Sequence, residues 1–153
     1  MGSIMNINYF MNEALIEARK AYKLNEVPIG AVLVDNTSKK IISRGHNQIN
    51  KFNNAIKHCE IELISETCEK LKLKYLNNIT MFVTLEPCSM CASAISEVHL
   101  NTLYFGAYDE KNGGIEKIRI AFQRNNIFVP SIYGGIMEEK CSNLIKNFFV
   151  DKR

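Results

Sequence analysis

The sequence predicts an α/β fold, in which a mixed sheet of about five strands has helices on both faces. Apolar residues first recur at helical spacing, and two short apolar runs joined by a polar connection follow. After them, strand-like and helix-like segments alternate, as is typical of a sheet covered by helices. The chain of 153 residues contains no internal repeat or linker-like tract, so we expect a single domain over residues 1–153.

The first half of the chain is expected to form a helix, a hairpin and a second helix. A helix over roughly the first 20 residues would have an apolar face made of Phe10, Ala14, Leu15, Ala18 and Tyr22. The apolar runs at 27–35 and 39–48 read as strands, and the polar residues 35–40 read as their hairpin connection. Apolar residues at helical spacing then predict a helix from about His58 to Lys74.

The second half is expected to continue the sheet and to end in a helix. Residues 77–85 have the composition of a strand that is buried on both faces. The remaining expected elements are a short helix from about Cys88, a strand at 101–109, a glycine-rich loop at 110–114, a helix at 115–123, a strand at 127–135 weakened by Pro130, and an amphipathic helix at 136–149.

Composition excludes few function classes. The net charge is only +3 and no run of Lys or Arg stands out, which neither requires nor excludes a nucleic acid partner. No apolar run approaches the roughly 20 residues that cross a bilayer, and no secretory signal is visible, so we expect no membrane association. The five cysteines are an odd number and two form C-x-x-C, which favours reduced thiols and a cytoplasmic protein.

His58, Cys88 and Cys91 have the residue types and spacing of a metal site. Zinc binds imidazole nitrogen and thiolate sulfur, and two cysteines three residues apart at the start of a helix can point to the same place. A helix N-terminus also carries partial positive charge, which favours the thiolate that zinc needs. Pro87 suits the entrance of that helix.

The number of available ligands favours a catalytic zinc site over a structural one. His46 and His99 lack ligand spacing, and Cys59 should point elsewhere because adjacent helical residues diverge by about 100°. Three protein ligands leave one position for water, as in catalytic zinc sites. Glu60 is near the metal without being needed as a ligand, so it is our candidate proton shuttle. The alternative for Glu60 is a favourable interaction with the helix dipole.

H-x-E followed by P-C-x-x-C is the signature of zinc-dependent nucleobase deaminases. Within them the sequence resembles the bacterial tRNA adenosine deaminases, through EVPIGAVLVD, GHNQI, HCE, TLEPCSMCASAI and YFGAYDEKNGG, and the resemblance covers most of the chain. It implies a three-layer α/β/α fold of the cytidine deaminase type, one zinc ion per subunit and a homodimer. It also implies deamination of adenosine to inosine at the wobble position of a tRNA anticodon, so the anticodon loop is the expected partner.

The resemblance also implies roles for individual residues. His58, Cys88 and Cys91 match the zinc ligands, and Glu60 matches the proton shuttle. Two further matches are Asn47, which would contact the target base, and Asp109, which would lie near the flanking nucleotide. Their alternatives are a turn-forming Asn and an Asp that caps a turn.

This chain departs from the family where RNA would contact it. Cys59 replaces the usual Ala within H-x-E, Asn54-Ala55 replaces Asp-Pro, and the C-terminal FFVDKR is less basic than is usual. These departures leave the metal chemistry intact and concern the substrate, so two alternatives stay open. One is a deaminase of free guanine, cytosine or cytidine. The other is a zinc-stabilised RNA-binding module, which would need a fourth protein ligand. Lysines that could line an RNA path are Lys51, Lys57, Lys111 and Lys152.

Overall fold

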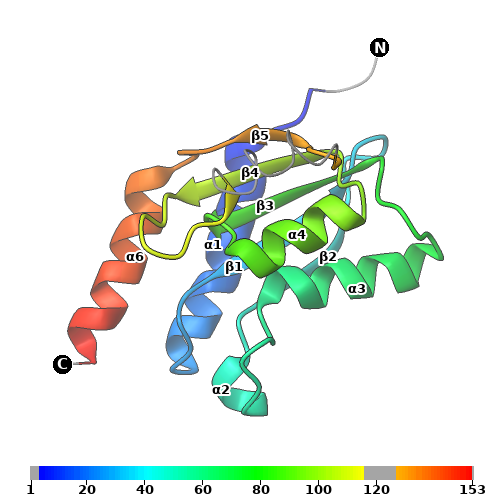
Figure 1. The fold of residues 1–153 in the computed structure, drawn as a ribbon. Helices are drawn as coiled ribbons and strands as arrows, with labels where there is room; N and C mark the ends of the chain where they lie inside the picture. Colours follow the sequence, from blue (N-terminus) through cyan, green and yellow to red (C-terminus); the bar gives the residue numbers. More distant parts are fainter. Residues whose placement is uncertain (1–3, 116–126, 153) are drawn as a thin grey trace.

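The computed structural model of the chain describes residues 4–115 and 127–152. Its elements are, in chain order, α1 (Ile7–Lys23), β1 (Gly30–Asp35), β2 (Ile41–His46), α2 (Ile49–Phe52), α3 (Cys59–Leu71), β3 (Ile79–Leu85), α4 (Ser89–Glu97), β4 (Thr102–Ala107), β5 (Ser131–Tyr133) and α6 (Glu138–Asp151). Figure 1 shows how these elements surround the sheet.

The five strands form one mixed sheet in the order β2-β1-β3-β4-β5. β1 is antiparallel to both β2 and β3, while β3, β4 and β5 run parallel. Because β3 and β4 are parallel, the loops that follow them leave the sheet at the same edge, together with the segment that follows β2. In α/β sheets, crevices at the carboxyl ends of strands are where ligands bind.

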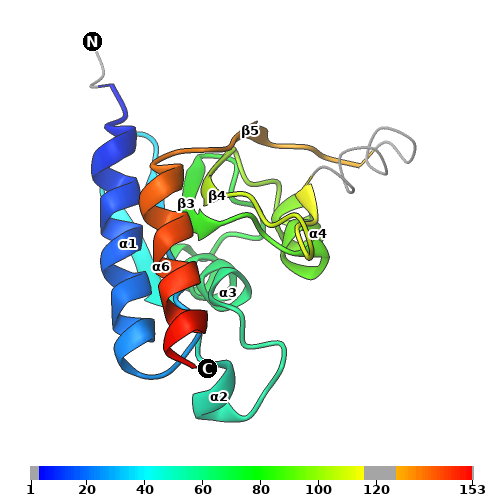
Figure 2. The same ribbon diagram turned by 90° about the vertical axis from the view of Figure 1, so that its left-hand side faces the viewer.

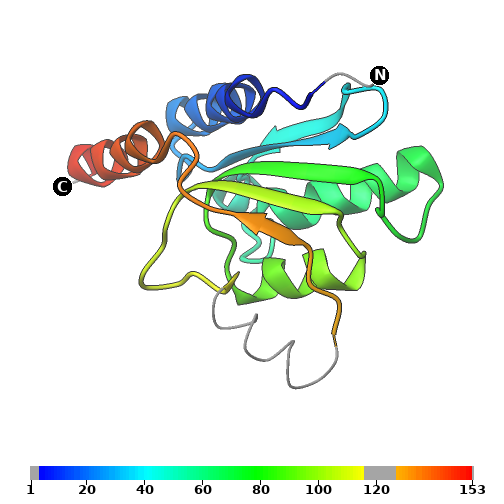
Figure 3. The same cartoon turned by 90° about the horizontal axis from the view of Figure 1, so that it is seen from above.

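Helices cover both faces of the sheet, which confirms the predicted fold class. Figure 3 shows α1 and α6 on one face and α3 and α4 on the other, and Figure 2 shows α1 and α6 side by side. Side chains alternate along β3, so that Met81 and Val83 pack under α3 and α4, while Phe82 packs under α1. The molecule therefore has two apolar clusters, one on each side of the sheet.

α1 lies directly on the sheet because Gly30 leaves room for it. A Cβ atom at Gly30 would lie 2.3 Å from the Ala14 carbonyl oxygen and 2.3 Å from the Ala18 nitrogen. The buried face of α1 includes Phe10, Ala14, Leu15 and Ala18, as predicted, and the helix is capped by Asn6, whose side chain accepts the Tyr9 N–H at 3.1 Å. None of the described helices is long and apolar enough to span a bilayer.

The structure differs from the sequence prediction at the end of α3 and in the presence of α2, and β5 is shorter than predicted, at Ser131–Tyr133. α3 ends at Leu71 rather than at Lys74, because Lys72 adopts a left-handed conformation that caps the helix. The short helix α2 was not predicted, since its four residues INKF carry no helical period. Of the helix predicted at 115–123, residues 116–123 lie outside the described residues.

Candidate metal centre and active-site cleft

The helices α3 and α4 place the predicted ligands at their starts. His58 is the N-cap of α3 and Cys88 is the N-cap of α4, and neither side chain caps its own helix. The imidazole and the thiol are therefore free to turn towards each other. Cys91, one turn into α4, is fully buried and points to the same place.

The three side chains converge closely enough to hold a metal ion. His58 Nδ1 lies 3.7 Å from Cys88 Sγ and 3.6 Å from Cys91 Sγ, and the three atoms lie within 4.8 Å of one another. Tetrahedral zinc with ordinary bond lengths would separate nitrogen from sulfur by roughly 3.5 Å. Within the described residues, this is the only group of three or more such side chains, and Cys59 is not part of it.

The two cysteines of this group differ in acidity. A hydrogen bond from Cys91 lowers the pKa of the Cys88 thiol to about 5, and that bond together with burial raises the pKa of Cys91. Cys88 is therefore the more acidic of the two thiols. Binding of a divalent cation would displace the thiol protons that remain, as it does at thiolate metal sites.

Glu60 is a buried carboxylate beside this group. It is only 4% exposed, and burial raises its pKa. The Cys59 thiol donates to Glu60 Oε1 at 3.2 Å, while the body of Cys59 packs in the apolar cluster under α3. A carboxyl group with a raised pKa accepts and releases protons more readily near neutral pH than an ordinary glutamate does.

His58 and Glu60 open onto a cleft at the carboxyl edge of the sheet. The cavity has a volume of about 1160 Å³. Its lining includes Asn47 after β2, Asp109 after β4 and several side chains of α6. The cavity is large enough for a nucleotide, and its lining combines apolar side chains with a few polar groups, as ligand sites usually do.

The whole chain is similar to known deaminases. A family model described as MafB19-like deaminase matches residues 5–153. A tRNA-specific adenosine deaminase of Rickettsia typhi is 45% identical over 144 residues, which cover 94% of this chain and 97% of the relative. The chain belongs to the tRNA-specific adenosine deaminase family.

Solved structures agree with this family membership. One, from a study of A-to-I editing by tRNA:A34 deaminases at the wobble position, matches with a TM-score of 0.82 at 40% identity, covering 89% of this chain and 98% of that chain. A guanine deaminase from Nitrosomonas europaea matches with a TM-score of 0.81 over 96% of this chain and 86% of that chain. Its identity is 16%, so that likeness concerns the fold alone.

Asn47 and Asp109 of this family member both line the cleft, and both also fix the backbone. Asn47 is buried and its Oδ1 accepts the Cys59 N–H at 3.1 Å, at the start of α3. Asp109 Oδ1 accepts the N–H groups of Lys111 at 3.2 Å and Asn112 at 2.9 Å, which closes a turn. The turn-capping alternative noted from the sequence thus describes a real contact of Asp109, whereas Asn47 bonds to the start of α3 and closes no turn through this contact. The substrate-binding roles of both residues remain predictions.

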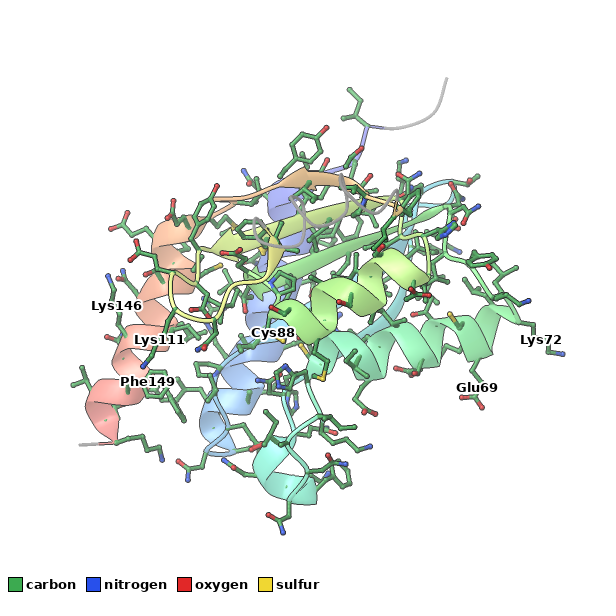
Figure 4. The ribbon with its side chains drawn as sticks, in the orientation of Figure 1. Glu69, Lys72, Cys88, Lys111, Lys146 and Phe149 are labelled. Carbon is green, nitrogen blue, oxygen red and sulfur yellow. The ribbon has the colours of Figure 1, made fainter. Side chains whose placement is uncertain are left out.

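Sequence reasoning missed that α6 forms one wall of the cleft of this deaminase. Lys146 and Phe149, three residues apart on α6, line the cavity, as does Lys111. Figure 4 shows these three side chains on the α6 side of Cys88, whereas Glu69 and Lys72 lie at the far end of α3. The available signal in the sequence was Phe149. Because Phe148 belongs to the buried face of α6, its neighbour Phe149 must lie on the exposed face, where it is close to Lys146.

The other lysines suggested by the sequence lie elsewhere. The ammonium groups of Lys51 and Lys57 lie 5.3 and 5.0 Å from the centre of the exposed Phe52 ring, and that of Lys152 lies 5.3 Å from the Phe148 ring centre. Lys57 also pairs with Glu62 at 3.3 Å. Of the four lysines, Lys111 is the one that lines the cleft.

Proposed function

We propose that this chain converts adenosine to inosine at the wobble position of a tRNA anticodon. The observation that carries the proposal is the convergence of His58, Cys88 and Cys91 beside the buried Glu60 in one cleft. The relative named tRNA-specific adenosine deaminase and the matching tRNA:A34 deaminase structure support the choice of substrate.

We infer one zinc ion per subunit, held by His58, Cys88 and Cys91. The nitrogen and sulfur donors and their separations fit this metal, and the C-x-x-C thiolate pair disfavours hard cations. When bound, zinc lowers the pKa of a coordinated water to roughly 7 and thereby supplies the nucleophile. Metal analysis of the purified protein tests this inference.

Glu60 moves the protons of the reaction. It takes a proton from the attacking water and delivers it to N1 of adenine as the oxygen bonds to C6. Glu60 then takes the proton of the resulting C6 hydroxyl and delivers it to the amino group. The C6–N bond breaks, ammonia leaves, and the C6=O bond of inosine forms. Burial of Glu60, which raises its pKa, suits a group that must hold a proton between two transfers.

Asn47 and Asp109 would orient the nucleotide. The Asn47 oxygen is already bonded to the Cys59 N–H, so its amide nitrogen is the group that it can offer to an acceptor atom of the base. Asp109, which follows β4, lines the same cavity as Asn47 and Glu60, so it would contact the nucleotide that flanks the target base. A base must leave its stack to reach such a site, so the substrate would be a single-stranded loop.

Lys111, Lys146 and Phe149 would hold the RNA strand beyond the target base. Ammonium groups meet phosphates, and an exposed aromatic ring accepts a stacked base. All three side chains line the same cleft as Glu60, which supports a path for RNA along α6.

The family resemblance further supports a single domain over residues 1–153, a homodimer and a cytoplasmic location. Light scattering of the purified protein tests the dimer. Expression of a tagged chain followed by cell fractionation tests the location.

The decisive experiment incubates purified protein with an anticodon stem-loop that carries adenosine at the wobble position and sequences the product for inosine. Free guanine and cytosine are assayed in parallel for ammonia release. Inosine in the RNA without release from the free bases supports the proposal. Release from a free base alone would instead establish the free-base alternative, and no product of either kind would favour an RNA-binding module.

A further inference from the structure

Glu86 is a second buried carboxylate at the cleft, and the reaction as derived above does not use it. It follows β3 and directly precedes Pro87 and the ligand Cys88. It is 7% exposed and lines the cleft. In the part of the chain that the structure describes, no ion pair involves Glu86, so a neighbouring cation does not account for its burial.

The side chain of Glu86 is bonded to the loop that carries Asp109. We call residues 108–114 the Asp109 loop. Glu86 Oε1 accepts the Asp109 N–H at 3.1 Å, and the Glu86 N–H donates to the Ala107 carbonyl at 2.9 Å. Glu86 therefore contacts the chain on both sides of the point where the Asp109 loop leaves β4.

The far end of the Asp109 loop closes onto the same turn. The Gly114 N–H donates to the Pro87 carbonyl at 2.8 Å, and Cys88 forms a β-bridge with Gly113. Gly113 packs so tightly that a Cβ atom there would lie 2.5 Å from Glu86 Oε1. The loop is thus folded around the Glu86 carboxylate, with one contact at each of its ends.

We propose that Glu86 is a positioning residue that fixes the Asp109 loop in the arrangement that lines the cleft. A side-chain oxygen placed at this distance satisfies the Asp109 backbone N–H whether or not it is charged, and burial excludes the water that would compete for that N–H. The loop carries Asp109 and Lys111, so its order should decide how well the RNA binds. This inference rests on the proposed function for its activity readout, but not for its structural readout.

Two variants separate the position of the acceptor from its charge. Glu86→Gln keeps an oxygen at the same reach and removes the charge, whereas Glu86→Asp keeps the charge and withdraws the oxygen by one methylene. We expect Glu86→Gln to resemble the wild type. We expect Glu86→Asp to raise KM for the anticodon stem-loop about tenfold, while kcat changes less than threefold because Glu60 and the metal ligands are untouched.

Amide hydrogen exchange of the Asp109 loop supplies a readout without catalysis. Glu86→Asp should speed exchange in peptides covering 108–114 about tenfold, and Glu86→Gln should leave it within about twofold of the wild type. Glu69→Asp, at an exposed glutamate far from the cleft, is the matched control and should change neither measurement.

The proposal is overturned if Glu86→Gln raises KM and speeds amide exchange as much as Glu86→Asp does, because the charge would then be what matters. It is also overturned if both variants match the wild type in both measurements. If the wild type forms no inosine, the proposed function fails, while the exchange measurement still decides the role of Glu86.

Discussion

At the scale of single residues, the chemistry of the cleft depends on how Glu60 is held. Its carboxylate is nearly out of water, follows the N-cap His58 by two positions and accepts a hydrogen bond from the Cys59 thiol. Burial raises its pKa, whereas an exposed glutamate in a first helical turn would only interact with the helix dipole. Glu60 also lies in the first turn of α3, so the dipole interaction considered from the sequence stays open beside the proton-shuttle role.

Replacing Glu60 with glutamine should separate proton transfer from metal binding. Glu60→Gln keeps the volume and an acceptor for the Cys59 thiol but cannot carry a proton, so we expect inosine formation to fall by at least about 100-fold. Zinc content, measured by mass spectrometry of the metal, should stay at one ion per chain. Glu69→Gln, at an exposed position further along α3, should retain full activity. Turnover at the wild-type rate in Glu60→Gln would remove the proton-shuttle role.

Residue spacing places Cys88 and Cys91 together, because both lie at the start of α4. His58 lies at the start of α3 and reaches them only because α3 packs against α4, so its place in the group was predicted from the family signature. Lys146 and Phe149 reach the same cleft from the last helix, and only the packing of α6 beside β4 brings them there. The sequence of α6 indicates that Phe149 is exposed, but it does not indicate which other part of the chain that face of α6 will lie beside.

At the scale of elements, α6 is the wall along which RNA would run. Lys146→Gln should weaken binding of the anticodon stem-loop and make the dependence of log K on log salt less steep by about 0.7, the slope of one phosphate contact on a single strand. Binding is measured by fluorescence anisotropy between about 50 and 200 mM salt. Lys72→Gln, at an exposed lysine at the far end of α3, is the matched control. An unchanged slope in Lys146→Gln would exclude a phosphate contact there.

The packing of α1 on β1 predicts a steric effect at Gly30. Gly30→Ala would push a Cβ atom against the backbone of Ala14 and Ala18, which cannot yield as a side chain can, so we expect a loss of about 2–3 kcal/mol in unfolding free energy. Gly45→Ala on the paired strand would meet only the Leu63 side chain at 3.3 Å and should cost less than about 1 kcal/mol. Urea denaturation compares the two variants, and equal losses would contradict the contact.

α1 also carries an acid-sensitive ion pair. Glu17 accepts hydrogen bonds from Lys20 at 2.7 Å and from Arg44 of β2 at 3.0 Å. Burial alone would raise the pKa of Glu17, but its hydrogen bonds and charge interactions with Lys20 and Arg44 outweigh burial and lower that pKa below the ordinary glutamate value of 4.5. The folded state thus binds the proton less tightly than the unfolded state, and the stabilisation is present above that value and lost as pH falls through the lower, folded pKa.

Glu17→Gln tests this ion pair. At pH 7 the variant should be less stable by about 1–2 kcal/mol, and the difference should shrink as the pH falls below 4.5 and Glu17 takes up a proton. Urea denaturation across this pH range measures the difference. A gap that stays constant down to pH 2 would show that charge is not its source.

At the scale of the whole molecule, the strands of the mixed sheet could be predicted more completely from the sequence than the helices that pack on it. The alternation of strand-like and helix-like segments was sufficient for five strands and helices on both faces, because burial imposes those periods directly on the sequence. The end of α3 and the existence of α2 were not predicted, since a left-handed Lys72 and a four-residue turn leave no periodic trace. Gly30 likewise gives no local sign that a helix will lie on it.

Metal removal should loosen the α3–α4 side of the molecule. The three proposed ligands lie at the starts of these two helices, so a zinc ion that binds them only in the folded chain would stabilise it by mass action. Treatment with a chelator should lower Tm by several degrees and abolish activity, and added zinc should restore both. Glu60→Gln, which keeps every ligand, should show the same drop in Tm. If the chelator left Tm unchanged, a bound metal ion would not contribute to the stability of the fold.

The separation of the apolar interior into two clusters has a consequence for how such a protein can change over generations. The three side chains that could hold a metal ion and Glu60 come from helices that pack on one cluster, whereas Lys146 and Phe149 belong to a helix that packs on the other. Mutations of α6 could therefore alter the contacts that Lys146 and Phe149 would make with a nucleic acid while leaving the other layer in place. Asn47 and the Asp109 loop are bonded to the starts of α3 and α4, so changes there would affect substrate preference and chemistry together.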